Sequence, residues 1–401
     1  MTDWWVWSST DLINWKMETK VQPSALSWEN VNTSVECWAT DAASFANGKT
    51  YFYLSVGPKQ VGVVSGSTPT GPFADPIGKP LVPIGMVPTY SRDPGVLMDT
   101  DGSNYLIFGT FSYYMAKLAP DMTSFAEKLR PVKINHLQHK DDKPFLHTMN
   151  GRYYLSWGCW YAVGDSPYGP FNFSGSVINV SALANSSFAD GGGTQDRHGS
   201  FFSLHGQSYF ACNDRSHGGG SGFRSTIISY VHYRANGTIA PVRIDETGVG
   251  NYNISATVAA GLNVWTIEAE DFYAVSGGAV KRQKDPSGPD PNGFEVAVSA
   301  GSSLSYPQVY SHNEKMQLTL LYSNGGDVAG KVTLLLNGDT AGATCTLKPT
   351  GGWDTYMNLT CGGPSRYRAN VRTGMMPDIG FNFTGPATEF ARVDAMNWLI
   401  Y

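Results

Sequence analysis

The 401-residue sequence is poor in charged residues, which make up only 15% of the chain. Its net charge of -5 comes without any basic run, whereas proteins that bind nucleic acid use clustered Lys and Arg to neutralise phosphates. No segment approaches the roughly 20 consecutive apolar residues that a membrane-spanning helix needs. We therefore expect no nucleic-acid partner and no membrane span.

Cysteine is also scarce, with five residues in the chain. Cys345 and Cys361 flank a predicted turn and are suited to a disulfide, which oxidising compartments permit. Cys37, Cys159 and Cys212 leave one thiol over, and buried unpaired thiols are an equal alternative for these three.

A signal peptide is not seen at the start of the chain, because Met1 leads directly into Asp3-Trp4-Trp5. Glycosylation sequons, in contrast, are abundant, and each would lie on the surface of a protein that passed through a secretory pathway. We therefore expect a secreted, extracellular protein whose signal peptide is not part of this chain. The eight sequons begin at Asn32, Asn172, Asn179, Asn185, Asn236, Asn253, Asn358 and Asn382.

Strand-forming and turn-forming residues are plentiful: aromatics account for 13% of the chain, with 45 Gly and 23 Pro. This composition favours an all-β protein. A phrase made of a turn Gly and an aromatic strand recurs at Gly48, Gly102, Gly151 and Gly206, at intervals of about 50 residues, the period of a propeller blade.

A second phrase closes most of these repeats and ends at Phe73, Phe125 and Phe171. The opening "SSTDLINW", ending at Trp15, has the same form. We therefore predict a five-bladed β-propeller over residues 1–255, with an N-terminally incomplete first blade. The sequence repeat ends near Gly250. In residues 262–401, segments of alternating apolar and polar residues predict a β-sandwich of the jelly-roll type.

Residues 1 to about 255 resemble glycoside hydrolase family 43. The resemblance rests on "SSTDLINW", "CWATDAASFANGKTYFYLS", "SRDPGVLMDTDGSNYLIFG", "DDKPFLHTMNGRYYLSWG" and "RHGSFF", taken in that order. The tail resembles carbohydrate-binding modules of families 6 and 35 through "IEAEDF", "LLYSNGG", "LLLNGD", "TGGWDTY" and "MNWLIY". The resemblance implies an active site at the propeller centre and cleavage that inverts the anomeric carbon.

Asp93 and Asp142 match two of the three carboxylates that the resemblance implies. Asp93 in "RDPG" corresponds to the carboxylate that orients the acid, although an Asx cap on the turn is an alternative. Asp142 takes the position of the acid, where the family has Glu before a small residue and Pro. Its neighbour Asp141 is distinguished by strand alternation, which turns only one of the two inward. A solvated charge run is the alternative for both.

In the family the catalytic base is an Asp on the first inner strand, and no such strand stands upstream of Asp3. A branch of the family suggests which residues replace the base. Exo-β-1,3-galactanases carry a Glu in the "ECWATD" position and a Gln near the fifth-blade His, which Glu36 and Gln195 match here. An amide cannot take a proton, so Gln195 is assigned to positioning the attacking water. A plain loop residue is the alternative for Gln195.

Several aromatic residues are candidates for stacking on sugar rings, since the C–H face of a pyranose is apolar. Most Trp residues of a propeller are core, which is the alternative reading. Asp41 is a further polar candidate for substrate contact. The candidate aromatics are Trp38, Trp157, Trp160 and Tyr161.

His198 in "RHGS" matches the family's axial histidine, which ligates calcium or an ordered water. In the tail, Glu268 and Glu270 stand two apart on a predicted strand and so face one side. With Asp394 or Asn397 they match the oxygen ligands of a structural calcium ion. Calcium is therefore the expected cofactor.

The predicted function is an exo-acting, inverting glycoside hydrolase, with exo-β-1,3-galactanase ahead of α-L-arabinofuranosidase or β-xylosidase. A catalytically dead, sugar-binding propeller is the alternative from another class, because the first blade is incomplete and the acid is Asp. We expect a monomer whose partner is a polysaccharide or oligosaccharide.

Overall fold

The computed structural model describes residues 2–10, 12, 14–29, 37–57, 60–178, 197–204, 207–214, 225–231, 233, 236–239, 241–242, 249, 264–272, 274–283, 294–306, 316–336, 339–365 and 379–400. Within these ranges the secondary structure is β-strand, apart from two short 3-10 helices, η1 (Pro23–Ala25) and η2 (Ala269–Asp271). No helix there has the length and apolar character needed to cross a membrane. The predicted all-β class is confirmed for the described residues.

The chain divides into two compact units. The first comprises Met1–Thr10, Asn14–Phe201 and Phe210–Ile227, and the second comprises Asp11–Ile13, Phe202–Tyr209 and Ile228–Tyr401. The predicted boundary at 255–262 lies outside the described residues, so the predicted ranges 1–255 and 262–401 stay predictions.

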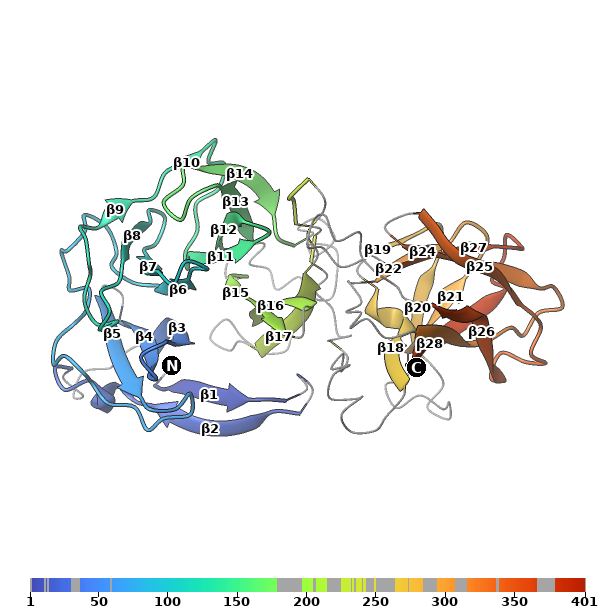
Figure 1. Cartoon of the computed structure of the whole chain (residues 1–401), viewed down its shortest axis with the longest axis horizontal. Helices are drawn as coiled ribbons and strands as arrows, with labels where there is room; N and C mark the ends of the chain where they lie inside the picture. Colours follow the sequence, from blue (N-terminus) through green and yellow to red (C-terminus); the bar gives the residue numbers. More distant parts are fainter. Residues whose placement is uncertain are drawn as a thin grey trace. The chain divides into compact units, whose positions relative to one another are not determined.

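Five small sheets follow one another along residues 4–231 of the described chain (Figure 1). In the first four of them, all pairings are antiparallel except that of β10 with β14. In order they are β1 (Trp4–Ser8) and β2 (Lys16–Val21); β3 (Cys37–Ser44), β4 (Thr50–Val56) and β5 (Gln60–Gly66); β6 (Gly95–Met98), β7 (Asn104–Phe108), β8 (Tyr114–Lys117) and β9 (Arg130–Pro131); β10 (Ile134–Asn135), β14 (Phe171–Ser176), β13 (Trp160–Gly164), β12 (Arg152–Trp157) and β11 (Phe145–Met149); and β15 (Gly199–Leu204), β16 (Gln207–Asp214) and β17 (Ser225–Val231).

The recurring aromatic phrase forms the second strand of four of these sheets, namely β4, β7, β12 and β16. The turn glycines that open it, Gly48, Gly102 and Gly151, all have positive φ, which glycine adopts without steric cost. Each sheet's aromatic and aliphatic side chains pack against the next sheet. One core joins β4 and β5 to β7, and another joins β7 and β8 to β12, β13 and β14.

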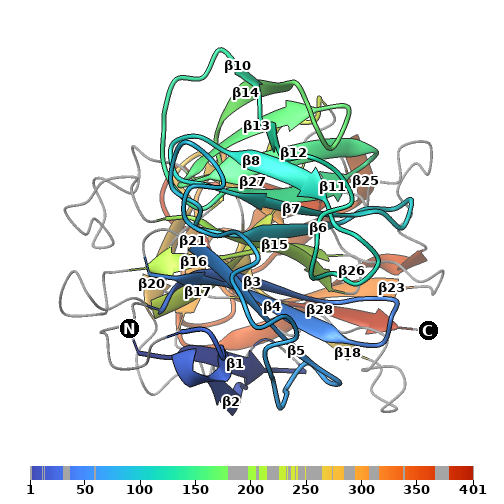
Figure 2. The same cartoon turned by 90° about the vertical axis from the view of Figure 1, so that its left-hand side faces the viewer.

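The first strands of successive sheets meet near the middle of the first unit. Strand β3 contacts β6, and β6 contacts β11. The rings of Phe145 on β11 and Phe201 on β15 lie 6.3 Å apart. Figures 1 and 2 show β3, β6 and β11 close to this centre. A closed five-bladed propeller with an incomplete first blade stays a prediction, although the first sheet has two described strands.

The second unit contains two sheets that share one apolar core. Val296, Leu318 and Val393 reach this core from one sheet, and Leu304, Val332 and Phe381 from the other. The jelly-roll connectivity stays a prediction. The first sheet is β20 (Val280–Gln283), β21 (Phe294–Val298), β28 (Ala391–Ile400), β23 (Met316–Ser323) and β26 (Tyr356–Ser365), with β18 (Val264–Glu268) also on β28; the second is β19 (Ala274–Ser276), β22 (Ser303–Tyr306), β27 (Ile379–Thr384), β24 (Gly330–Leu336) and β25 (Asp339–Leu347).

A disulfide between Cys345 and Cys361 joins these two sheets, as the sequence predicts. Cys345 lies on β25 and Cys361 on β26, with their Cα atoms 5.8 Å apart. Cys37, Cys159 and Cys212 are buried, in agreement with the alternative weighed for them.

We predict that Cys345→Ser lowers the free energy of unfolding of the second unit by about 3 kcal/mol, because the bond closes a loop and restricts the unfolded chain. Urea unfolding, with and without reductant, measures the loss. The matched controls are Cys361→Ser and the double variant, which should lose the same amount. A double variant as stable as the wild type would contradict a stabilising role for the bond.

Candidate functional site

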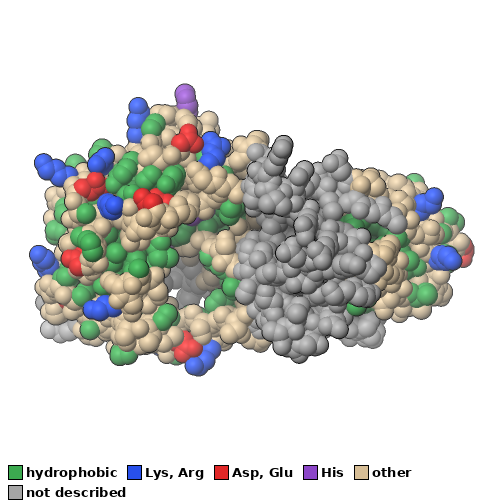
Figure 3. All heavy atoms as spheres, in the orientation of Figure 1, with side chains coloured by type: hydrophobic (Ala, Val, Ile, Leu, Met, Phe, Trp, Pro, Cys, Tyr) green, Lys and Arg blue, Asp and Glu red, His purple; other side chains and the backbone are tan. Residues whose placement is uncertain are grey.

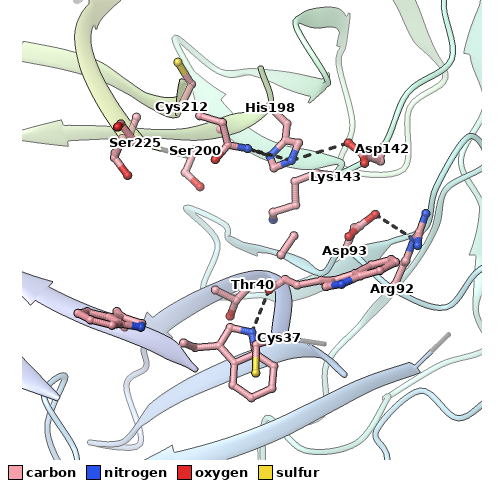
Figure 4. Close-up of a pocket in the computed structure, with 18 of the residues that line it drawn as sticks. Cys37, Thr40, Arg92, Asp93, Asp142, Lys143, His198, Ser200, Cys212 and Ser225 are labelled. Atoms are coloured by element: carbon pink, nitrogen blue, oxygen red, sulfur yellow. Dashed lines mark hydrogen bonds and ion pairs between the residues drawn. The ribbon is translucent and has the colours of Figure 1, made fainter. Parts of the chain in front are cut away.

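A cavity of about 740 Å³ lies in the first unit, and its walls carry four of the predicted site residues, Trp38 and three that the ends of strands bring together. Asp93 precedes β6, Asp142 precedes β11, and His198 precedes β15, so consecutive sheets bring them together. Figure 4 shows these three side chains around the Lys143 side chain. Charged side chains of both signs are interspersed over the face of the first unit seen in Figure 3.

Asp93 is held rigidly at the base of this cavity and is 4% exposed. Thr110 Oγ1 donates a hydrogen bond of 2.7 Å to Asp93 Oδ2, and the Asp93 N–H donates to Ser55 Oγ at 2.7 Å. Arg92 Nε lies 3.5 Å from the same carboxylate oxygen. Burial raises the pKa of Asp93, and the charge of Asp142 raises it further, while Thr110 and Arg92 oppose both.

Asp142 also lines the cavity. Its side chain is 27% exposed, which is more than that of Asp93. Its backbone is fixed on both sides: the Asp142 N–H donates to Asp141 Oδ1 at 2.9 Å, and the Gly158 N–H donates to the Asp142 carbonyl at 3.0 Å. The predicted acid therefore stands on an anchored turn, with Oδ1 of its carboxylate buried and the side chain as a whole partly exposed.

Asp141 does not face the cavity, but Asp141 and Asp142 lie on the turn before β11, so the premise of strand alternation is wrong. It is 4% exposed and does not line the cavity. Its carbonyl accepts hydrogen bonds from the Phe111 N–H and the Tyr113 hydroxyl. Gly158, with φ of +50°, leaves the space that the Asp141 carboxyl fills. Burial raises the pKa of Asp141 to about 6.

His198 lies beside Asp142 and Asn213. His198 Nε2 is 3.8 Å from Asp142 Oδ1, and Asn213 Nδ2 is 3.1 Å from the same ring nitrogen. Asn213, from β16, therefore orients the ring, and sequence reasoning did not identify it. Within the described ranges no three or more His, Cys, Asp or Glu side chains gather as potential metal ligands, here or elsewhere.

Trp38 lines the cavity as predicted, with the Arg92 guanidinium 4.6 Å from its ring centroid. Arg92 covers one face of the indole, and stacking of Trp38 on a sugar stays a prediction. Asp41 does not line the cavity. Its Oδ2 accepts the Val96 N–H at 2.8 Å and thereby joins β3 to β6, so its predicted substrate contact is corrected to a link between sheets.

Two aromatic residues of the β12–β13 hairpin, Trp157 and Tyr161, correct the sequence interpretation, whereas sugar contact by the third, Trp160, stays a prediction. Trp157 and Tyr161 are 0% and 2% exposed, so neither can stack on a sugar. Trp160 is covered by the His139 ring at a centroid distance of 3.7 Å. Trp157 Nε1 also donates to the His139 carbonyl at 3.1 Å. These side chains anchor the loop that leads to Asp142.

Glu36 and Gln195, predicted for the water-activating part of the site, lie outside the described residues. In the second unit, Glu268 ends β18 whereas Glu270 belongs to η2, so the premise that both lie on one strand is wrong. Glu270 and Asp394 are buried, and Asn397 lies opposite Thr266. Their oxygen atoms suit calcium in kind, and because no three His, Cys, Asp or Glu side chains gather here among the described residues, the calcium site stays a prediction.

Comparison with known proteins agrees with this arrangement. The family model for glycosyl hydrolases family 43 matches residues 1–239. The chain belongs to this family.

Family 43 relatives carry several names. An arabinoxylan arabinofuranohydrolase of Paenibacillus polymyxa is 25% identical and aligns with 88% of this chain. The chain spans only 60% of that relative's length. A β-D-galactofuranosidase of Aspergillus niger is 30% identical over 62% of this chain and 76% of its own. The structure of a Bacillus subtilis arabinoxylan arabinofuranohydrolase, 22% identical, superposes over 100% of this chain and 88% of its own with a TM-score of 0.53, which supports the fold.

The buried Asp141 carboxyl generates a prediction about stability and pH. Its pKa is raised from the ordinary 3.8 to about 6, so the folded state favours the protonated form. Stability should therefore fall as pH rises from about 4 to about 6, by roughly 3 kcal/mol at most. Asp141→Asn should remove this fall, as measured by urea unfolding at several pH values. Asp165→Asn, at an 88% exposed side chain, is the control and should leave the fall intact.

Proposed function

We propose that this chain is an inverting, exo-acting glycoside hydrolase that acts on plant cell-wall polysaccharide. The observation that carries the proposal is the pair Asp93 and Asp142, two carboxylates in different surroundings within one cavity. Membership of family 43 supports the reaction class. The chain spans less than two thirds of the length of its first relatives, so their activities do not carry over directly. The activity must therefore be tested on this chain itself.

The surroundings of the two carboxylates suggest their roles. The hydroxyl of Thr110 and the guanidinium of Arg92 both stabilise an ionised Asp93. Two neighbouring carboxylates resist joint ionisation, and because these contacts favour the charged form of Asp93, we assign the shared proton to Asp142. Asp142 is also the more exposed of the two. Asp142 would give this proton to the leaving glycosidic oxygen, while the Asp93 charge keeps Asp142 protonated and oriented.

The attacking water belongs on the opposite face of the sugar, where an inverting enzyme leaves room for it. We assign its positioning to Gln195, and include Glu36 among the candidate catalytic residues, on the resemblance to exo-β-1,3-galactanases. That assignment makes β-1,3-galactan the first candidate substrate. The names of the relatives favour a second candidate, an α-L-arabinofuranoside or β-xyloside.

A panel of β-1,3-galactan, arabinoxylan, arabinan and xylan tests the substrate class. Release of free galactose alone supports the galactanase, and release of arabinose or xylose supports the second candidate. Proton NMR of the first product distinguishes inversion from retention. Binding without any product release would favour the sugar-binding, non-catalytic alternative.

Asp142→Asn should reduce turnover by about 10²-fold or more, because the amide cannot donate the proton that the leaving oxygen needs. Initial rates on the substrate identified by the panel measure the loss. Asp141→Asn is the control and should stay within a few-fold of the wild type, since its side chain does not line the cavity. A rate above roughly a tenth of wild type in Asp142→Asn would exclude it as the acid. Asp142→Glu should raise the rate of an enzyme and change nothing in a binding protein.

Gln195→Ala should depress kcat far more than it raises KM, because the contact to water matters chiefly in the transition state. Azide, which needs no deprotonation, should restore part of the rate and yield a glycosyl azide of inverted configuration. Wild-type kinetics in this variant would move water activation elsewhere, with Glu36 the next residue to test.

We also propose that residues 262–401 bind carbohydrate and that the protein is secreted. The resemblance of the tail and the two sheets with one core support the first part. The second is supported by the four described sequon asparagines, Asn172, Asn236, Asn358 and Asn382, which are all exposed. Retention on insoluble polysaccharide and a mass shift on deglycosylation test the two parts.

A further inference from the structure

Two turns that carry the carboxylates have the same unusual form. Asp93 has φ of +60° and precedes Pro94, and Lys143 has φ of +52° and precedes Pro144. Residues other than glycine rarely adopt this left-handed backbone conformation, and a following proline restricts the backbone further. Such conformations persist only where the surrounding structure fixes them, so the two turns must be held by contacts with their neighbours.

The two turns are in direct contact. Lys143 Nζ donates a hydrogen bond of 2.5 Å to the carbonyl of Pro94. At Gly95 an added Cβ would lie 2.6 Å from the carbonyl oxygen of Pro144, so the chains meet backbone to backbone. The strands that follow, β6 and β11, also contact each other.

Lys143 is the side chain that links these turns inside the cavity. It is 4% exposed and lines the cavity wall. Burial of an ammonium group is unfavourable unless opposite charges and acceptors surround it. Asp41, Asp93 and Asp142 supply the charges, and the Pro94 carbonyl supplies the acceptor. Figure 4 shows Lys143 between Asp142 and Asp93.

We propose that Lys143 is a positioning residue that clamps the Asp93 turn to the Asp142 turn and so fixes where the acid stands in the cavity. This inference rests on the proposed function of the same cavity. At this position the family resemblance predicts a small residue, so the clamp is a property of this chain. Lys143 acts through the two carboxylates and not on the substrate.

Lys143→Met keeps the length and removes the charge and the hydrogen bond, so it tests the clamp. A misplaced acid should matter for an unactivated sugar leaving group and hardly at all for 2,4-dinitrophenolate, which leaves without protonation. We expect kcat on an oligosaccharide to fall by about 10²-fold, and kcat on the matching 2,4-dinitrophenyl glycoside to fall less than about fivefold, with KM unchanged for both. Lys140→Met, at an exposed position on the same loop, is the control and should match the wild type.

Hydrogen exchange followed by mass spectrometry tests the clamp without any activity. Peptides covering residues 92–98 and 138–146 should both exchange faster in Lys143→Met, and peptides from β24 and β27 should not change. Gly95→Ala, which forces the same turns apart, should reproduce this pattern and serves if Lys143→Met does not fold.

Three results would overturn the inference. These are unchanged exchange in residues 92–98, an equal loss of kcat on both leaving groups, and a rise in KM alone, which would mean that Lys143 contacts the sugar. A wild-type protein that hydrolyses neither substrate would refute the proposed function, and the exchange measurement would still decide the clamp.

Discussion

The structure of the site depends on one electrostatic constraint: two carboxylates, one of them buried, share a cavity. Left alone, the charge of Asp142 would make ionisation of Asp93 unfavourable. Three groups oppose this effect: the hydroxyl of Thr110, which donates a hydrogen bond, the guanidinium of Arg92 and the buried ammonium of Lys143. Each of the three comes from a different part of the chain, so the sheets must be correctly assembled before the carboxylates acquire distinct protonation states.

The loop before Asp142 is held in place by aromatic residues that do not themselves line the cavity. The loop before Asp142 is tied to the β12–β13 hairpin by the stack of His139 on Trp160 and by the hydrogen bond from Trp157 to the His139 carbonyl. The Asp141 carboxyl fills the space above Gly158. Buried tryptophans here thus serve the site by fixing a loop, a role that composition alone does not separate from sugar stacking.

The sequence predicted the all-β class, the strands formed by the repeated phrase, the disulfide and the meeting of Asp93, Asp142 and His198. The first three follow from local signals such as turn glycines, alternation and cysteine spacing, whereas the meeting of the three side chains is what the resemblance to family 43 implies. The roles of Trp157, Tyr161 and Asp41 were not predicted, because burial and a hydrogen bond to Val96 depend on the neighbouring sheet. Lys143 was overlooked for a similar reason: its importance comes from a carbonyl that lies 49 residues earlier in the chain. Glu268 and Glu270 were misjudged because the strand ends between them.

Asp142, the proposed acid, is an aspartate, which gives a reason for this amount of restraint. Its side chain is one methylene shorter than glutamate, so it has less freedom to adjust towards a glycosidic oxygen, and its backbone must stand where the proton is needed. The hydrogen bonds to both peptide groups of Asp142, the packing of Asp141 on Gly158 and the backbone contact at Gly95 all act on that backbone position. In a chain with a longer acid, part of this restraint could be given up, because side-chain rotation would make up for small errors in the turn.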